Sequence, residues 1–213
     1  MPYPMTHLYI AKRVTELRPE LMKDLPQYYL GTLSPDSIHF RLSFTANDKK
    51  ATHLCVGDEK WGEVTNNPEW TESVLSFLRG YKNADGFVLG YCIHILADIY
   101  NNISNVWLPY KRKSKPETDK NYGDQYNGEQ AAVDSRLAYE FQYKDEVWDM
   151  LEKSHSLTIR NIVRADDIDK MKENILHVQY VNTNSDTALN KFYTHEYALK
   201  QIEDTALFVL KNI

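Results

Sequence analysis

Cysteine is scarce in this chain, and so are the patterns that mark secretion or membrane insertion. The two cysteines in 213 residues, Cys55 and Cys92, stand beside apolar residues and form no CxxC pair. We therefore expect buried free thiols rather than a disulfide framework. No apolar run approaches the roughly 18 residues that a membrane-spanning helix needs, and no basic segment followed by an apolar one opens the chain. We expect a cytoplasmic protein without a membrane span.

Basic charge is also limited. The formal net charge is −5, whereas proteins that bind extended nucleic acid usually carry a basic surplus. A single basic run, at residues 111–115, lies between two prolines and is interpreted as a solvated loop. Extended nucleic-acid binding is therefore not expected.

Glycine and proline are few, with eight of each, and alternation typical of strands is rare, whereas helical spacing recurs. The length suits one domain over residues 1–213. We therefore expect an all-α fold, a multi-helix bundle with long connecting loops. The expected helices cover residues of about 5–22, 68–80, 86–103, 129–155, 165–178 and 185–211. The expected loops cover 31–39 and 108–128.

The segment 86–103 carries apolar residues around its whole circumference, which predicts a helix buried at the centre of the bundle. His94 and Asp98 lie four residues apart on it and therefore point from the same face. An ionised carboxylate buried without partners is costly, so Asp98 needs a metal, a cation or several donors. Imidazole and carboxylate both suit zinc. A His94–Asp98 hydrogen bond without metal is the alternative.

Three further residues are weaker candidates when each is taken alone. Asp36 stands in a segment stiffened by Pro35, where an acid is usually a simple turn residue. His53 follows a lysine-rich turn, and His7 lies at the start of the first expected helix. Each of these histidines has an ordinary interpretation as a core residue.

The order of these segments resembles the successive motifs of the bacterial zinc-dependent phospholipase C family, which is related in fold to the P1-type nucleases. The resemblance extends from residue 5 to about residue 107. The segments that carry it are MTHL (5–8), GTLSPDSIHFR (31–41), KATHL (50–54) and FVLGYCIHILAD (87–98).

The resemblance implies a metal-dependent hydrolase with Asp36 and Asp98 as catalytic metal ligands. By that resemblance Asp36, His53, His94 and Asp98 hold one zinc, Asp98 bridges to a second, and His7 helps to hold the second. Such a pair polarises a phosphoryl group and supplies a water of lowered pKa. The family's further His, six residues after the bridging acid, is replaced here by Ser104, and its downstream HxxxE pair has no clean counterpart. We therefore expect one or two zinc ions, with other divalent metals as an option.

The second half offers Asp134 as a further metal-ligand candidate, because its neighbours are apolar. An acid at a solvated helix N-terminus, as for Glu129, is the ordinary alternative. His39 and Arg41 adjoin Asp36 and are candidates for substrate binding, since Arg pairs two phosphate oxygens well. A plain surface ion pair is equally compatible. His195 is interpreted as a core residue.

These residues together predict a cytoplasmic phosphoesterase that acts on a small-molecule or lipid phosphate ester through a metal-activated water. The alternative, from a different class, is a metal-stabilised binding or structural protein without catalysis. An open coordination position favours the enzyme, and a closed four-ligand site favours the structural role.

Overall fold

The structure is a computed structural model that describes residues 3–21, 23–81, 86–104, 116–160, 162–183 and 186–213, with the backbone alone for 116–122. Over these residues the regular elements are helices, and the sole β-type pairing is a single bridge between Ile159 and Val163. The predicted all-α class is therefore confirmed. None of the described helices combines the length and the apolar character needed to cross a membrane.

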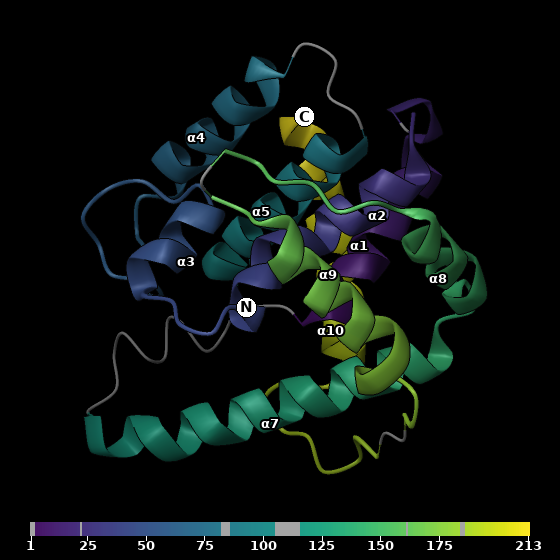
Figure 1. Ribbon diagram of the computed structural model, residues 1–213. Coiled ribbons are helices and arrows are strands. Elements are labelled where there is room, and N and C mark those ends of the chain that lie inside the picture. Colours follow the sequence, from purple (N-terminus) through teal and green to yellow (C-terminus); the bar gives the residue numbers. More distant parts are fainter. Residues whose placement is uncertain (1–2, 22, 82–85, 105–115, 161, 184–185) are drawn as a thin grey trace.

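The α-helices of the bundle range from seven residues in α3 to 25 in α7, and loops and short helical turns connect them (Figure 1). The first half contains α1 (Pro4–Leu17), η1 (Pro19–Leu21), α2 (Leu25–Leu33), η2 (Ser34–Phe40), α3 (Ala46–Thr52), α4 (Asn67–Gly80) and α5 (Gly86–Ser104). The second half contains α7 (Pro116–Glu140), α8 (Lys144–Lys153), α9 (Ala165–Asn174), η3 (Ile175–Gln179) and α10 (His195–Asn212).

Several helices begin at side chains that satisfy the free N–H groups of a first turn. Thr45 and Asp48 form a reciprocal capping box at the start of α3. Asn66 accepts from the Glu69 N–H at α4, and Thr194 accepts from the Tyr197 N–H at α10. Local sequence therefore sets where these helices start.

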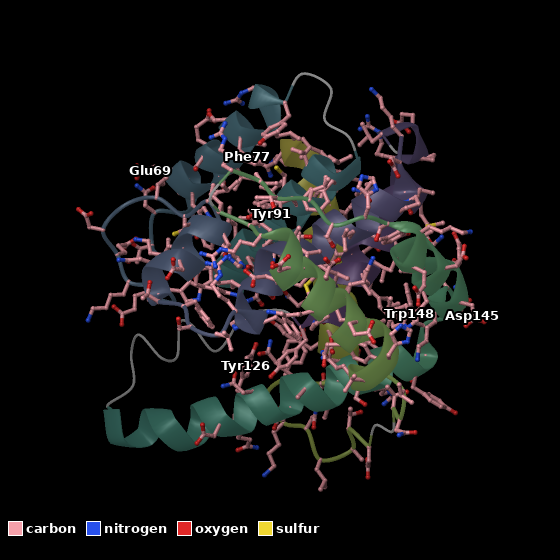
Figure 2. The ribbon with its side chains drawn as sticks, viewed as in Figure 1. Glu69, Phe77, Tyr91, Tyr126, Asp145 and Trp148 are labelled. Carbon is pink, nitrogen blue, oxygen red and sulfur yellow. The ribbon has the colours of Figure 1, made fainter. Side chains whose placement is uncertain are left out.

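Helix α5 occupies the middle of the bundle, as predicted, with α2, α4 and α10 packed around it (Figure 1). Its approach to α2 is close because glycines lie at the contact. A Cβ at Gly90 would overlap the Tyr28 carbonyl oxygen, and one at Gly31 would overlap the Phe87 carbonyl oxygen. Tyr91 of α5 lies near the centre of the view in Figure 2 and is fully buried.

Two predicted loops are wrong in part. Residues 31–39 are helical, because α2 runs to Leu33 and η2 follows at once. Pro35 stands in the first turn of η2, where a missing N–H costs nothing. Residues 116–128 of the expected 108–128 loop belong to α7, and 108–115 lie outside the described residues. Buried Tyr126, on the side of α7 that faces the bundle (Figure 2), helps to hold this segment against its low helix propensity.

Three predicted helix boundaries are also wrong. The first helix ends at Leu17 rather than near residue 22, because Pro19 disfavours helical backbone at the residue before it. The expected helix 129–155 is two helices, α7 and α8, separated at Phe141, which turns into the core and packs on Tyr9. The last helix begins at His195 instead of residue 185.

The segment before α10 is kept out of a helix by tertiary hydrogen bonds. The N–H groups of Lys191, Phe192 and Tyr193 all donate to the carboxylate of Glu129 on α7. Leu189, which falls within the expected helix of 185–211, is 85% exposed. A buried acid on another element therefore sets the conformation of this loop.

Candidate metal centre

The five predicted first-half ligands converge from four elements. His7 comes from α1, Asp36 from η2, His53 from the C-cap of α3, and His94 and Asp98 from α5. Four of them are almost completely buried, while the Asp36 side chain remains 21% exposed. The structure therefore joins residues up to 91 positions apart in sequence, from His7 to Asp98, in one cluster.

Backbone carbonyls orient two of the imidazoles. The Nδ1 atom of His94 lies 2.7 Å from the Thr32 carbonyl oxygen, and the Nδ1 atom of His53 lies 3.0 Å from that of Lys49. A carbonyl only accepts, so in each ring Nδ1 carries the proton and donates, which leaves the Nε2 lone pair free. Metal-binding histidines are usually oriented in this way.

The free Nε2 atoms face two carboxylates at the spacing of metal ligands. The Nε2 atom of His53 lies 3.3 Å from Asp36 Oδ1 and 3.3 Å from Asp98 Oδ2. The Nε2 atom of His94 lies 3.9 Å from Asp36 Oδ2 and 3.7 Å from Asp98 Oδ2. Ligands about 2.0–2.1 Å from a tetrahedral ion are about 3.4 Å apart, so these His–Asp distances are close to those of a zinc-type shell. Asp36, His53 and His94 form one group that could hold a metal ion.

His7 forms a second group with His94 and Asp98. Its Nε2 atom lies 3.7 Å from Asp98 Oδ1, the oxygen that does not face His53. The His7 ring stacks on that of His94, with centroids 3.7 Å apart. Asp98 Oδ1 therefore faces His7, whereas Oδ2 faces His53 and His94. A carboxylate that bridges two metal ions has the same kind of arrangement.

Many of the polar atoms in this cluster have no hydrogen-bond partner within the described part of the chain. They are both ring nitrogens of His7, Nε2 of His53, Nε2 of His94 and both oxygens of Asp98. Buried polar atoms in proteins are almost always paired, because an unpaired one loses its hydration without compensation. Five of these atoms, all but His7 Nδ1, lie at the spacing of metal ligands, which fits a group that supplies positive charge.

The electrostatics of the cluster favour neutral imidazoles. Burial, followed by the charge of Lys49, lowers the pKa of His53 to about 3, and burial lowers that of His94 to about 4. Burial and the neighbouring His94 lower the pKa of His7 well below its usual value. The histidines are therefore unprotonated at neutral pH, which is the form that binds metal.

The two carboxyl groups differ in charge. Burial, and then the charge of Asp36, raises the pKa of Asp98 to about 8. Burial acts in the same direction on Asp36, but Lys49 and the two neighbouring imidazoles hold its pKa well below the usual range. Without metal, one carboxyl group is thus ionised beside a lysine, and the other keeps its proton.

A cavity of about 510 Å³ opens beside the cluster. His7, Asp36 and His94 line it, so the cavity borders three of the candidate ligand residues. The remaining lining is mostly apolar or uncharged: Tyr3, Pro4, Leu33, His39, Phe40, Asn127, Gln130, Met171, Ile175 and Gln179. A small molecule therefore has room to reach the cluster.

His39 and Arg41, the predicted substrate-binding residues, have different positions. His39 lines the cavity, with its Nε2 atom 2.7 Å from Lys49 Nζ. Arg41 is instead engaged in an ion pair, with its Nε 2.9 Å from Asp167 Oδ2, and it does not line the cavity. For Arg41 the structure therefore shows the ion pair that the sequence left open as the alternative to substrate binding. His39 is the better candidate for contact with a substrate.

Asp134, the predicted extra ligand, does not join either group. Its Oδ1 accepts the N–H groups of Met5 and Thr6, and its Oδ2 accepts the Tyr180 hydroxyl. Glu129 is likewise held by backbone N–H groups, as described above, and His195 pairs with Glu140 at 2.8 Å. These residues stabilise the packing around the centre.

Sequence reasoning missed Lys49, which is 3% exposed and paired with Asp36. It also missed Thr32, whose carbonyl orients His94. Lys49 stands four residues before His53, and that spacing was a usable signal, because it places the Lys49 carbonyl within reach of the His53 ring. No sequence signal reports on the Thr32 carbonyl, which reaches His94 from another helix.

Comparisons with protein-family models, with curated proteins and with solved structures gave no match to this chain. Function is therefore inferred from the chemistry of the site.

Proposed function

We propose that this cluster binds one or two divalent metal ions, zinc fitting best, and that the protein hydrolyses a phosphate ester at them. The observation that carries the proposal is the set of five buried atoms at metal-ligand spacing, unpartnered within the described residues, beside an open cavity. Imidazole nitrogen and carboxylate oxygen together suit zinc better than magnesium or calcium, which prefer oxygen alone.

The distances assign the residues to two positions. Asp36, His53, His94 and Asp98 Oδ2 would hold the first ion. His7 and Asp98 Oδ1, with His94 nearby, would hold the second. The same order of ligands along the chain underlies the resemblance to the zinc-dependent phospholipases C, and we propose a distant relationship to them.

When bound, such metal ions polarise a phosphoryl oxygen and lower the pKa of water, which makes a nucleophile available near neutral pH. The chain's own residues would fix this arrangement. Asp98 sets the distance between the two positions, because its two oxygens face different groups. His39 lies at the cavity wall, where a donor can contact a phosphate oxygen, and apolar Leu33 and Phe40 limit water there.

The lining of the cavity suits a small-molecule or lipid phosphate ester. Apart from the ligand residues and His39, the described residues that line its walls carry no charged side chain. A compact ester with an uncharged body would therefore be accommodated without an unpaired charge.

A metal-stabilised binding or structural protein is the second candidate. It is favoured by one observation: Asp36, His53, His94 and Asp98 are enough to complete a tetrahedral shell. A closed shell leaves no position for a substrate. The His7 side of the cluster, which faces the cavity, favours the hydrolase instead.

Metal content and hydrolysis of nitrophenyl phosphate mono- and diesters test the proposal together. We expect one or two zinc ions per chain, turnover that a chelator abolishes and zinc restores, and a clear loss of metal in His94→Ala. His177→Ala is the matched control, because His177 is half exposed and pairs only with glutamates of α8 and α9. Full metal content in His94→Ala would refute the assignment. Metallated protein inactive on lipid, nucleotide and synthetic esters would favour the structural role.

A further inference from the structure

Lys49 places a buried cation inside the candidate metal centre. Its side chain is 4% exposed, and its ammonium group forms an ion pair with Asp36 Oδ1. The same Nζ atom lies 2.7 Å from His39 Nε2 and 5.7 Å from the centre of the Trp61 ring. A solvent-exposed lysine would be unremarkable, but a buried one is costly unless a partner compensates its charge.

The carboxylate that compensates Lys49 is also a candidate ligand of the first metal position. Asp36 Oδ1 lies 3.3 Å from His53 Nε2 and contacts the ammonium group at the same time. A metal ion bound there would share one carboxylate with a fixed positive charge. Lys49 and the ion therefore compete electrostatically for Asp36.

We propose that Lys49 serves as a resident cation for the centre: it holds Asp36 in place when metal is absent and keeps a metal ion at the first position exchangeable. This inference rests on the proposed metal site and adds a role for a residue that is not itself a ligand. Lys49 is thus a positioning residue that acts through Asp36.

Two opposing effects decide the sign of its influence on metal affinity. Two like unit charges about 4 Å apart at a partly buried site repel each other strongly enough to lower a binding constant by about a thousandfold. For a divalent ion the repulsion energy is doubled. Loss of an outer hydrogen bond to a metal ligand weakens metal binding by about 10- to 100-fold. Repulsion is the larger effect, so removing the charge should strengthen metal binding.

Lys49 also contributes its backbone carbonyl to the centre, and a side-chain substitution does not remove that group. The hydrogen bond to His53 Nδ1 is accepted by the Lys49 backbone carbonyl and not by its side chain. Lys49→Met therefore removes the charge and keeps both the orientation of His53 and the unbranched shape of the side chain. Lys49→Arg keeps the charge.

Lys50→Met is the matched control. Lys50 is the next residue of α3, but its ammonium group donates to the Gly57 and Glu59 carbonyls, away from the cluster. The variant changes the net charge of the protein by the same amount as Lys49→Met. Any long-range charge effect on metal binding should appear in both variants.

The test is calorimetric titration of zinc into metal-free full-length protein, together with melting of the metal-free and zinc-loaded forms. We expect Lys49→Met to bind zinc at least about tenfold more tightly than wild type, while Lys49→Arg and Lys50→Met stay within about threefold. We expect Lys49→Met to lower the melting temperature of the metal-free form and to approach wild type once zinc is bound, because the ion then compensates Asp36.

The outcomes separate this inference from the proposed function. Equal or weaker zinc binding by Lys49→Met, or an equal loss of melting temperature in both forms, would overturn the role of Lys49 alone. Absence of zinc binding in wild type and variants would overturn the metal site and this inference with it. Tighter zinc binding by Lys49→Met without phosphoesterase activity would support the inference and reject the hydrolase.

Discussion

Two carboxyl groups, Asp98 on α5 and Asp134 on α7, are both buried but differ in their hydrogen bonding. They are 1% and 2% exposed, and in each case burial is the main cause of a raised pKa, to about 8 for Asp98 and about 7 for Asp134. Asp134 accepts hydrogen bonds from two backbone N–H groups and from Tyr180. Asp98 receives none from the described residues and faces imidazole nitrogens with free lone pairs.

The difference shows that burial alone does not identify a functional acid. Asp134 satisfies the first N–H groups of α1, and therefore helps to fix the helix that carries His7. Asp98 has no such donors among the described residues: its ionised form needs a cation, whereas its protonated form faces the Nε2 atoms of His53 and His94. The absence of donors, rather than the raised pKa, separates a ligand from a structural residue.

The largest expected effect is on catalysis. Asp98→Asn removes the carboxylate that faces both proposed metal positions, so the proposed turnover should fall by on the order of a thousandfold or more, and zinc content should fall with it. Asp134→Asn should keep its full zinc content and most of its activity. Zinc analysis and the nitrophenyl ester assay on both variants measure this. Equal residual activity in Asp98→Asn and wild type would place the reaction elsewhere.

The next largest effect concerns the glycines of the same two helices. Gly90→Ala should destabilise the protein by about 3 kcal/mol or more, because its Cβ would overlap the Tyr28 carbonyl and separate α2 from α5. The shift should also weaken zinc binding, since the Thr32 carbonyl on α2 orients His94.

Gly128→Ala on α7 is the control for this substitution. Within the described part of the chain, no atom other than those of its chain neighbours and of the nearby α7 backbone lies within 4 Å of the Cβ position there, so alanine should be neutral or stabilising by up to about 1 kcal/mol. Urea unfolding of both variants measures the contrast. A Gly90→Ala protein as stable as wild type would show that the approach of the two helices is not needed.

A smaller effect concerns the stability of the metal-free protein, to which Asp134 should contribute more than Asp98. At pH 5 without metal both carboxyl groups are protonated, as their pKa values indicate. Asp134→Ala should then lower the free energy of unfolding by about 2 kcal/mol, because it leaves buried donors unpaired. Asp98→Ala should change it by less than about 1 kcal/mol, since no hydrogen bond is lost. A larger loss for Asp98→Ala in chelator-treated protein would contradict the comparison.

The last prediction concerns the dependence of stability on pH. Unfolded Asp titrates near 3.9, whereas the pKa of buried Asp134 is about 7. Between these values the unfolded chain loses a proton that the folded protein keeps. The free energy of unfolding should therefore fall as pH rises from about 4 to about 7, by up to about 1.4 kcal/mol per pH unit from this group. Asp134→Asn should show a shallower fall, measured by urea unfolding of metal-free protein, and an unchanged slope would reject the raised pKa.

The sequence by itself determined the all-α class and the buried central helix. Both follow from local information, because apolar spacing specifies a helix and apolar residues on every side specify burial. The i, i+4 spacing of His94 and Asp98 fixed their common face, and the motif order brought His7, Asp36 and His53 into the same hypothesis.

The tertiary structure alone decided which acids are satisfied and where the C-terminal helices begin and end. Glu129 holds the segment before α10, and Asp134 binds the start of α1, through backbone N–H groups that are distant in sequence. Every residue except proline offers such a group, so composition and periodicity do not predict which N–H group pairs with which acid. The same holds for the Thr32 carbonyl at His94 and for the burial of Lys49, which depend on how closely separate helices approach.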